Sequence, residues 1–209
     1  MIPRCFRSFV TSASSVVDYT AVNDFWFGDP VVESGRDMWW KKDATLDAEI
    51  KDKFLFSLEA AKSGRLEEWS KQPMSCLALV VLLDQFSRNI FRDQPQAFEA
   101  DNLAKSLVID AIELNMDTKL HPIQRSVFYL PFEHSENKED QKRSVELYAQ
   151  LLDAAPKDQQ TTYEQALQFA KKHKEIIDRF GRFPHRNQIL QRPSSEEEIQ
   201  FLTQPGSSF

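Results

Sequence analysis

Apolar residues recur along this chain at intervals of three and four, which is the spacing of one face of an α-helix. The clearest example begins at Thr45 and ends before Gly64, with apolar positions at Leu46, Ile50, Phe54, Leu58 and Ala61. The same periodicity predicts helices over residues 18–27, 74–91, 97–115, 122–130, 141–152 and 161–180. No alternation of polar and apolar residues is long enough to predict a strand, so the expected fold class is all-α.

Residue types that begin and end helices support these boundaries. Asp18 is suited to cap the first helix and Gly28 to end it. Gly181 is a natural end for the helix over 161–180. Ser194 with Glu197 three residues later predicts a capping box, and hence a last short helix.

The helix predicted over residues 74–91 has two different halves. Its first half, 77–83, is apolar on every side, which indicates a helix buried at the centre of the fold. In its second half, Asp84, Arg88 and Arg92 follow one another at intervals of four, so they share a face. The central helix is therefore predicted to carry charges into the interior.

The predicted helices are joined by short turns, which favours antiparallel helical hairpins in a tetratricopeptide-like right-handed stack. One helical domain is expected over residues 18–202, and the tail over 203–209 is expected to be disordered. Residues 29–40 form a predicted loop, with Trp39 and Trp40 folded back onto the core.

Composition removes several classes of function. The net charge of −6 argues against nucleic acid as a partner, because binding to a phosphate backbone needs a cationic surface. Five glycines are few for phosphate-binding or dinucleotide-binding loops, and no fingerprint of either is present, so no cofactor is predicted. The two cysteines form neither a disulfide framework nor a metal motif. No apolar stretch approaches the roughly 20 residues of a membrane-spanning helix.

The first 17 residues differ from the rest of the chain. They contain Arg4 and Arg7, several Ser and Thr, and no acidic residue. This composition is typical of an organelle transit peptide, and it is equally that of an irregular N-terminal extension. The first interpretation predicts a mitochondrial or plastid protein and the second a cytoplasmic one.

Three charged motifs stand out, and they lie far apart in the chain. They are LDQFSRNIFR at residues 83–92, PFEHSE at 131–136 and RFGRFPHRN at 179–187. Together with Phe25-Trp-Phe-Gly28, they are similar to those of a bacterial family known as domain of unknown function 924. The resemblance covers residues 18–202 and implies a tetratricopeptide-like helical fold, without implying a reaction. Members of that family lack a basic extension like residues 1–17.

One hypothesis for the motifs is an internal ion-pair network. Buried charges have to be paired, and the motifs supply both signs. Arginines would fork onto carboxylates of neighbouring helices, with Gln85, Asn89 and Asn187 satisfying the remaining polar groups. The residues concerned are Arg88, Arg92, Arg179, Arg182 and Arg186, with Asp84, Asp101, Glu133 and Glu136.

The second hypothesis is a binding site for an anionic small molecule or an acidic peptide end. Arg182 and Arg186 flank Pro184, which can begin a short helix, and helix N-termini with nearby arginines favour a negative group. Arg88 and Arg92 would complete the pocket. If carboxylates already satisfy all four arginines, this hypothesis loses its basis. The whole predicted site comprises Asp84, Gln85, Arg88, Asn89, Arg92, Glu133, His134, Glu136, Arg179, Arg182, His185, Arg186 and Asn187.

A third hypothesis makes the same site a hydrolase or transferase. His134 or His185 would transfer protons, with Glu133 or Asp84 as the partner carboxylate. No serine or cysteine nucleophile motif accompanies them, so a hydrogen-bonded histidine at a helix end is the simpler interpretation.

Other functions have less support in the sequence. On a helix, Glu133 and Glu136 would share a face while His134 points elsewhere, so no metal site is predicted. His173 is expected on a solvated or half-buried face, between two lysines. A structural subunit of a larger assembly remains the alternative to both binding and catalysis, and the oligomeric state is not predicted.

Overall fold

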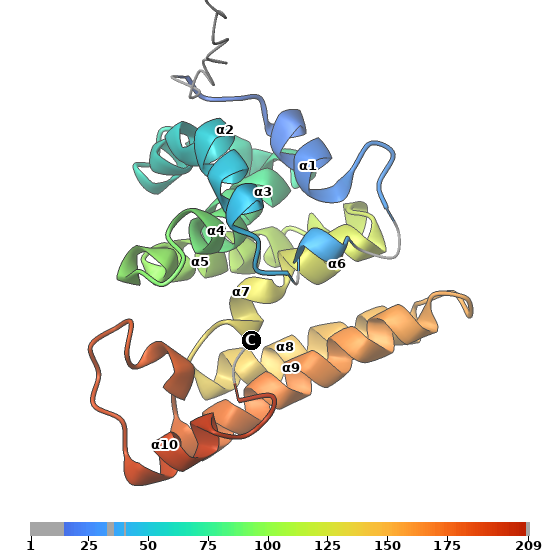
Figure 1. Ribbon diagram of the computed structural model, residues 1–209. Helices are drawn as coiled ribbons and strands as arrows, with labels where there is room; N and C mark the ends of the chain where they lie inside the picture. Colours follow the sequence, from blue (N-terminus) through green and yellow to red (C-terminus); the bar gives the residue numbers. More distant parts are fainter. Residues whose placement is uncertain (1–14, 33–35, 40, 208–209) are drawn as a thin grey trace, which may run out of the picture.

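The computed structural model of the chain describes residues 15–32, 36–39 and 41–207 (Figure 1). Within these residues every regular element is a helix, which confirms the all-α class. Most of the predicted extension over 1–17, and Trp40, lie outside the described residues. No described helix combines the length and apolar character needed to cross a membrane.

The first two helices begin and end close to where the sequence predicts. Helix α1 spans Tyr19–Phe27, and the Asp18 carboxylate accepts a hydrogen bond from the Thr20 N–H at 2.9 Å. Gly28 ends it with φ of 85°, a conformation in which an added Cβ would lie 3.1 Å from the Pro30 carbonyl oxygen. Helix α2 spans Ala44–Lys62.

The expectation for Trp39 is confirmed. Its ring stacks on that of Trp26 at 5.8 Å between centroids. Its indole N–H donates to the Trp26 carbonyl at 3.0 Å. The loop is therefore held against the end of α1.

The central helix is not regular throughout. It consists of α3 (Pro73–Val80), a π-helical segment (Val81–Phe86) and α4 (Ser87–Ile90). In the π-helical segment the Ser87 N–H donates to the Leu82 carbonyl, five residues back. Side chains satisfy the next two carbonyls, since Ser87 Oγ donates to Leu83 at 2.7 Å and Arg88 Nη1 donates to Asp84 at 2.6 Å. The prediction of one regular α-helix over 74–91 is therefore wrong for residues 81–86, which are π-helical.

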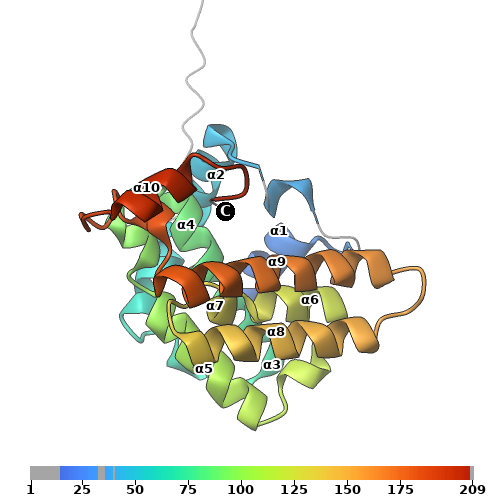
Figure 2. The same ribbon diagram turned by 90° about the horizontal axis from the view of Figure 1, so that it is seen from below.

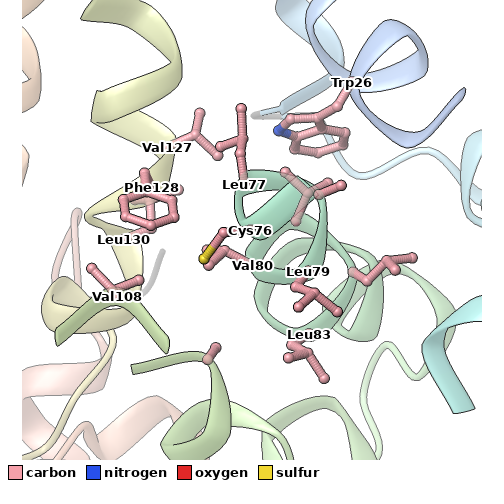
Figure 3. Packing of buried hydrophobic residues seen from close by; sticks show 14 of the residues in the cluster. Trp26, Cys76, Leu77, Leu79, Val80, Leu83, Val108, Val127, Phe128 and Leu130 are labelled. Atoms are coloured by element: carbon pink, nitrogen blue, oxygen red, sulfur yellow. The ribbon is translucent and has the colours of Figure 1, made fainter. Parts of the chain in front are cut away.

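The interior of the fold lies around this helix. Helices α1, α2, α5 and α6 pack against it. Figure 3 shows Cys76 and Val80 turned toward Val108 and Phe128, and all four side chains are buried. The prediction that 77–83 is buried on every side is confirmed.

The helix predicted over 97–115 is divided in two. A 3₁₀ turn covers Pro95–Phe98, and α5 covers Asp101–Glu113. The break places Asp101 in the first turn of α5, where its carboxylate accepts two hydrogen bonds from Arg88. Helix α6 (Pro122–Phe128) and the single turn α7 (Leu130–Glu133) follow.

The longest helices form one antiparallel hairpin, α8 (Lys138–Asp153) with α9 (Gln160–Phe180) (Figures 1 and 2). It lies beneath α7, and Gly181 ends α9 with φ of 69°, as predicted. Because α1, α2, α5 and α6 pack around the central helix instead of continuing this hairpin pattern, the tetratricopeptide-like stack is not confirmed.

The C-terminal segment returns toward α7. It contains a 3₁₀ turn, Pro184–Arg186, and α10, Glu196–Leu202. The capping box is formed by Ser195 and Glu198, one residue later than predicted. Ser194 is not the cap because its hydroxyl accepts a hydrogen bond from the Asn187 side chain at 3.1 Å. Where a disordered tail was predicted, residues 203–207 form turns and Ser207 is buried.

Candidate functional site

Residues of the second and third charged motifs line one cavity of about 390 Å³, and residues of the first motif contact this lining. His134, at the end of α7, and Arg186, on the turn Pro184–Arg186, contribute side chains to its lining. Asp84 and Arg88 reach it from the central helix through their contacts with the lining residues His134 and Asp101. The lining residues are Pro95, Phe98, Glu99, Asp101, Asn102, Lys105, Pro131, His134, Ser135, Glu136, Arg186 and Leu190.

Asp84 is a buried carboxylate that orients His134. Its side chain is 0% exposed, and Oδ1 lies 2.8 Å from His134 Nδ1 and 3.2 Å from Arg88 Nη1. Burial alone would raise the pKa of Asp84, but Arg88 and His134 outweigh it and hold the pKa below its ordinary value. An ionised carboxylate can only accept hydrogen bonds, which assigns the proton of the neutral imidazole to Nδ1.

His134 is therefore a neutral imidazole whose Nε2 carries no proton. Burial and the charges of Arg88 and Arg186 lower its pKa, and the opposing effect of Asp84 does not compensate. Nε2 has no hydrogen-bond partner among the residues that the structure describes. Because Nδ1 is engaged with Asp84 and the ring lines the cavity, Nε2 is the nitrogen left to accept a proton there.

Arg88 is held by hydrogen bonds within the protein through both terminal nitrogens. Its Nη1 and Nη2 donate to the two oxygens of Asp101, both at 3.1 Å, and Nη1 also donates to the Asp84 carbonyl. This fork is the strongest geometry available to an arginine and a carboxylate. Arg88 thus joins the central helix to α5, as the ion-pair hypothesis predicts.

Arg186 is buried, but its guanidinium has few polar contacts. Its side chain is 8% exposed, and its guanidinium carbon lies 4.7 Å from the ring centroid of Phe98 and 4.6 Å from that of Phe183. Nη1 lies 3.6 Å from Asp101 Oδ2, and the guanidinium forms no hydrogen bond with any described residue. Burial and Arg88 lower its pKa to about 10, so it stays charged at neutral pH.

Other predicted site residues are satisfied away from the cavity. Arg92 forks onto Asp47 of α2 at 2.5 and 2.8 Å, and Asn89 donates to the same carboxylate. Arg182 forks onto Glu198 at 2.6 and 2.8 Å. Arg179 pairs with Glu197 at 2.8 Å on the surface. Gln85 donates to Asp84 and supports the histidine contact from behind.

Glu136 lines the cavity but already has partners. Its carboxylate accepts two hydrogen bonds from Arg192, at 2.7 and 3.0 Å, and one from the Phe183 N–H at 2.8 Å. Arg192 also donates to Asn187 at 3.0 Å. Arg192 is not among the predicted site residues, although it follows the third motif by only a few residues.

Behind the pair of Asp84 and His134 lies a second buried pair. Glu133 Oε1 is 3.2 Å from His173 Nδ1, and both residues are 4% exposed. Burial and Asp84 raise the pKa of Glu133 to about 8, whereas burial lowers the pKa of His173 to about 3. The expectation that His173 is solvated or half-buried is wrong. It lies on the same face of α9 as Ala170 and Ile177, one turn away on either side.

The remaining candidates do not form a metal site. His185 packs on Phe183 at 5.6 Å between centroids, and burial lowers its pKa to about 4. Glu133 and Glu136 turn to different partners. In the part of the chain that the structure describes, no three His, Cys, Asp or Glu side chains are placed to hold one metal ion.

Most of the chain is similar to a known protein family and to a solved structure. The model of a bacterial protein family of unknown function, DUF924, matches residues 22–206. A solved structure of a protein of unknown function from Agrobacterium tumefaciens is 36% identical, with a TM-score of 0.77, and the match covers 88% of this chain and 96% of that chain. No curated protein matches the sequence.

Proposed function

Because the chain belongs to the bacterial DUF924 family, whose description assigns no reaction, we propose from its own site that it is an acid–base enzyme acting on a small anionic molecule. The observation that supports this most strongly is that one cavity is lined by both an unbonded buried arginine and an oriented neutral histidine. The activity would be that of a hydrolase or a transferase.

Arg186 supports the binding of an anion. A buried charge without hydrogen bonds is costly, because it has lost the water that would have solvated it. A carboxylate or phosphate group in the cavity would restore that interaction, and a guanidinium grips either group through two hydrogen bonds. A volume of about 390 Å³ suits a small metabolite better than a peptide.

His134 supports catalysis on the bound molecule. Its Nε2 would take a proton from water or from a substrate hydroxyl, which then attacks the bond to be broken. Asp84 would stabilise the imidazolium ion that forms, since its carboxylate already accepts the hydrogen bond from Nδ1–H. The imidazolium would return its proton to the leaving group, so the histidine ends the cycle neutral.

The test uses a panel of small esters and thioesters that carry a carboxylate, together with phosphomonoesters. We expect His134→Gln to lower kcat by about 100-fold or more with little change in KM. Arg186→Met should mainly raise KM, because it removes the anchor of the substrate. Arg179→Met, which changes a surface arginine outside the cavity, serves as the matched control and should behave as the wild type.

Two results would contradict the enzyme. Unchanged turnover in His134→Gln would remove the histidine from the chemistry. A wild-type chain that binds the free acids but turns over none of the panel would instead establish the second candidate, a binding protein for small anions.

A further inference from the structure

The charges around the cavity are paired, with one exception. A ligand must therefore bind to the charged group that has no close ion-pair partner in the protein. Apart from Arg186, each charged side chain in the lining has a close ion-pair partner: Glu99 with Lys62 at 3.0 Å, Asp101 with Arg88 at 3.1 Å, Lys105 with Asp140 at 2.7 Å, and Glu136 with Arg192 at 2.7 Å. Among these charged side chains, Arg186 alone forms no hydrogen bond with a described residue, so its guanidinium has unused donors.

The carboxylates near Arg186 disfavour a second negative charge on the ligand. Asp101 Oδ2 lies 3.6 Å from Arg186 Nη1, and Glu136 lines the same cavity. A phosphate monoester carries close to two negative charges at neutral pH, whereas a carboxylate carries one. One cation can balance a single charge, and a further charge would face like charges in a poorly solvated place.

The surroundings of Arg186 also restrict the shape of the anionic group. The rings of Phe98 and Phe183 lie against the guanidinium, with their centroids 4.7 and 4.6 Å from its central carbon. The N–H groups of a guanidinium point outward in its plane, and the two oxygens of a planar carboxylate match two of them at one edge.

The rest of the lining indicates the body of the ligand. Pro95, Phe98, Pro131 and Leu190 contribute apolar surface to the cavity. Burial of an uncharged, partly apolar body against these side chains would add to the affinity.

We infer that the substrate of this cavity is a small monocarboxylate with an uncharged, partly apolar body, its carboxylate held by Arg186. This inference rests on the proposed anion site and goes further by excluding phosphates and dicarboxylates.

The experiment measures binding of butyrate, benzoate, succinate and inorganic phosphate to the full chain by calorimetry at matched ionic strength. Succinate has the chain length of butyrate, so it isolates the effect of a second charge. Butyrate and benzoate should bind at least about tenfold more tightly than succinate or phosphate. Arg186→Met should lose this binding and Arg179→Met should keep it.

The outcomes separate this inference from the proposed function. If phosphate or succinate binds the wild type more tightly than the monocarboxylates, and Arg186→Met abolishes that binding, the anion site stands and the monocarboxylate is overturned. If none of the four probes binds the wild type better than it binds Arg186→Met, both the anion site and the monocarboxylate are overturned.

Discussion

Asp84 Oδ1 and His134 Nδ1 lie 2.8 Å apart, although 50 positions separate the two residues in the chain. The carboxylate comes from the π-helical segment of the central helix, and the histidine caps the end of α7. The contact therefore exists only when the N-terminal helices and α7 are packed together. It fixes the tautomer of a histidine that lines a cavity, and this assignment can be measured directly.

Nitrogen NMR of the histidine ring should find His134 neutral at pH 7, with the proton on Nδ1 and none on Nε2. Asp84→Asn should shift this equilibrium toward the Nε2–H tautomer, because an amide is a weaker acceptor than a carboxylate. The same spectrum of Arg179→Met should be unchanged. A protonated Nε2 in the wild type would contradict the role of His134 as a base.

Arg88 and Arg186 should respond differently to loss of charge. Arg88→Met should lower the free energy of unfolding by about 3 kcal/mol or more, because buried Asp84 and half-buried Asp101 both lose the arginine that pairs with them. Arg186→Met should change it by no more than about 1 kcal/mol, since Arg186 has no hydrogen bonds to lose and Met packs well between phenyl rings. Urea unfolding measures both. If both variants lost the same free energy of unfolding, Arg186 would be a structural ion-pair partner like Arg88.

Glu133 should make the fold less stable as the pH rises. Its pKa is raised to about 8 in the folded chain, against about 4.3 when unfolded, so between these values the folded state holds a proton that the unfolded state has released. Its contribution is complete below about pH 4.3 and is lost as the pH passes 8. As the pH rises through this window, the free energy of unfolding of Glu133→Gln should increase relative to that of the wild type by up to about 1.4 kcal/mol for each pH unit. A difference that does not vary with pH would show that Glu133 is ionised when buried.

His173 should have the opposite effect on the acid side. Its pKa falls to about 3 in the folded chain, so below about pH 6.5 the unfolded state binds a proton that the folded state does not. Stability is therefore lost as the pH falls from 6.5 toward 3. His173→Gln should have a smaller difference in melting temperature between pH 7 and pH 5 than the wild type. An equal difference would assign the acid sensitivity to other groups, such as His185.

The helices were predictable because the face that each one buries is visible in its own periodic pattern of apolar residues. The apolar stripe of α2 lies within one helix and needs no knowledge of its neighbours. The cap of α10 was displaced by one residue because the choice between Ser194 and Ser195 depends on Asn187, which is brought to Ser194 by the fold.

The site was predictable only in part, for a related reason. The motifs correctly gathered Asp84, His134 and Arg186, yet a pattern on one helix does not show which partner another helix presents. Arg92 shares a helix face with Arg88 in the sequence pattern, but Asp47 of α2 binds it instead. Arg182 and Arg186 were both candidates for binding an anion, but the sequence could not show that Glu198 pairs with Arg182 while no described residue forms a hydrogen bond with Arg186.

The π-helical segment makes the site depend on the number of residues in the central helix as well as on their identity. Each residue of a regular α-helix turns the chain by about 100°. A π-helical turn holds one residue more than an α-helical turn, so deleting one residue between Val81 and Phe86 would restore the regular helix and move Asp84 relative to His134. A relative with a one-residue gap here could keep every charged residue of the motifs and still lack the site. Alignments of this family should therefore be judged first by helix length at this point, and only then by the residues they share.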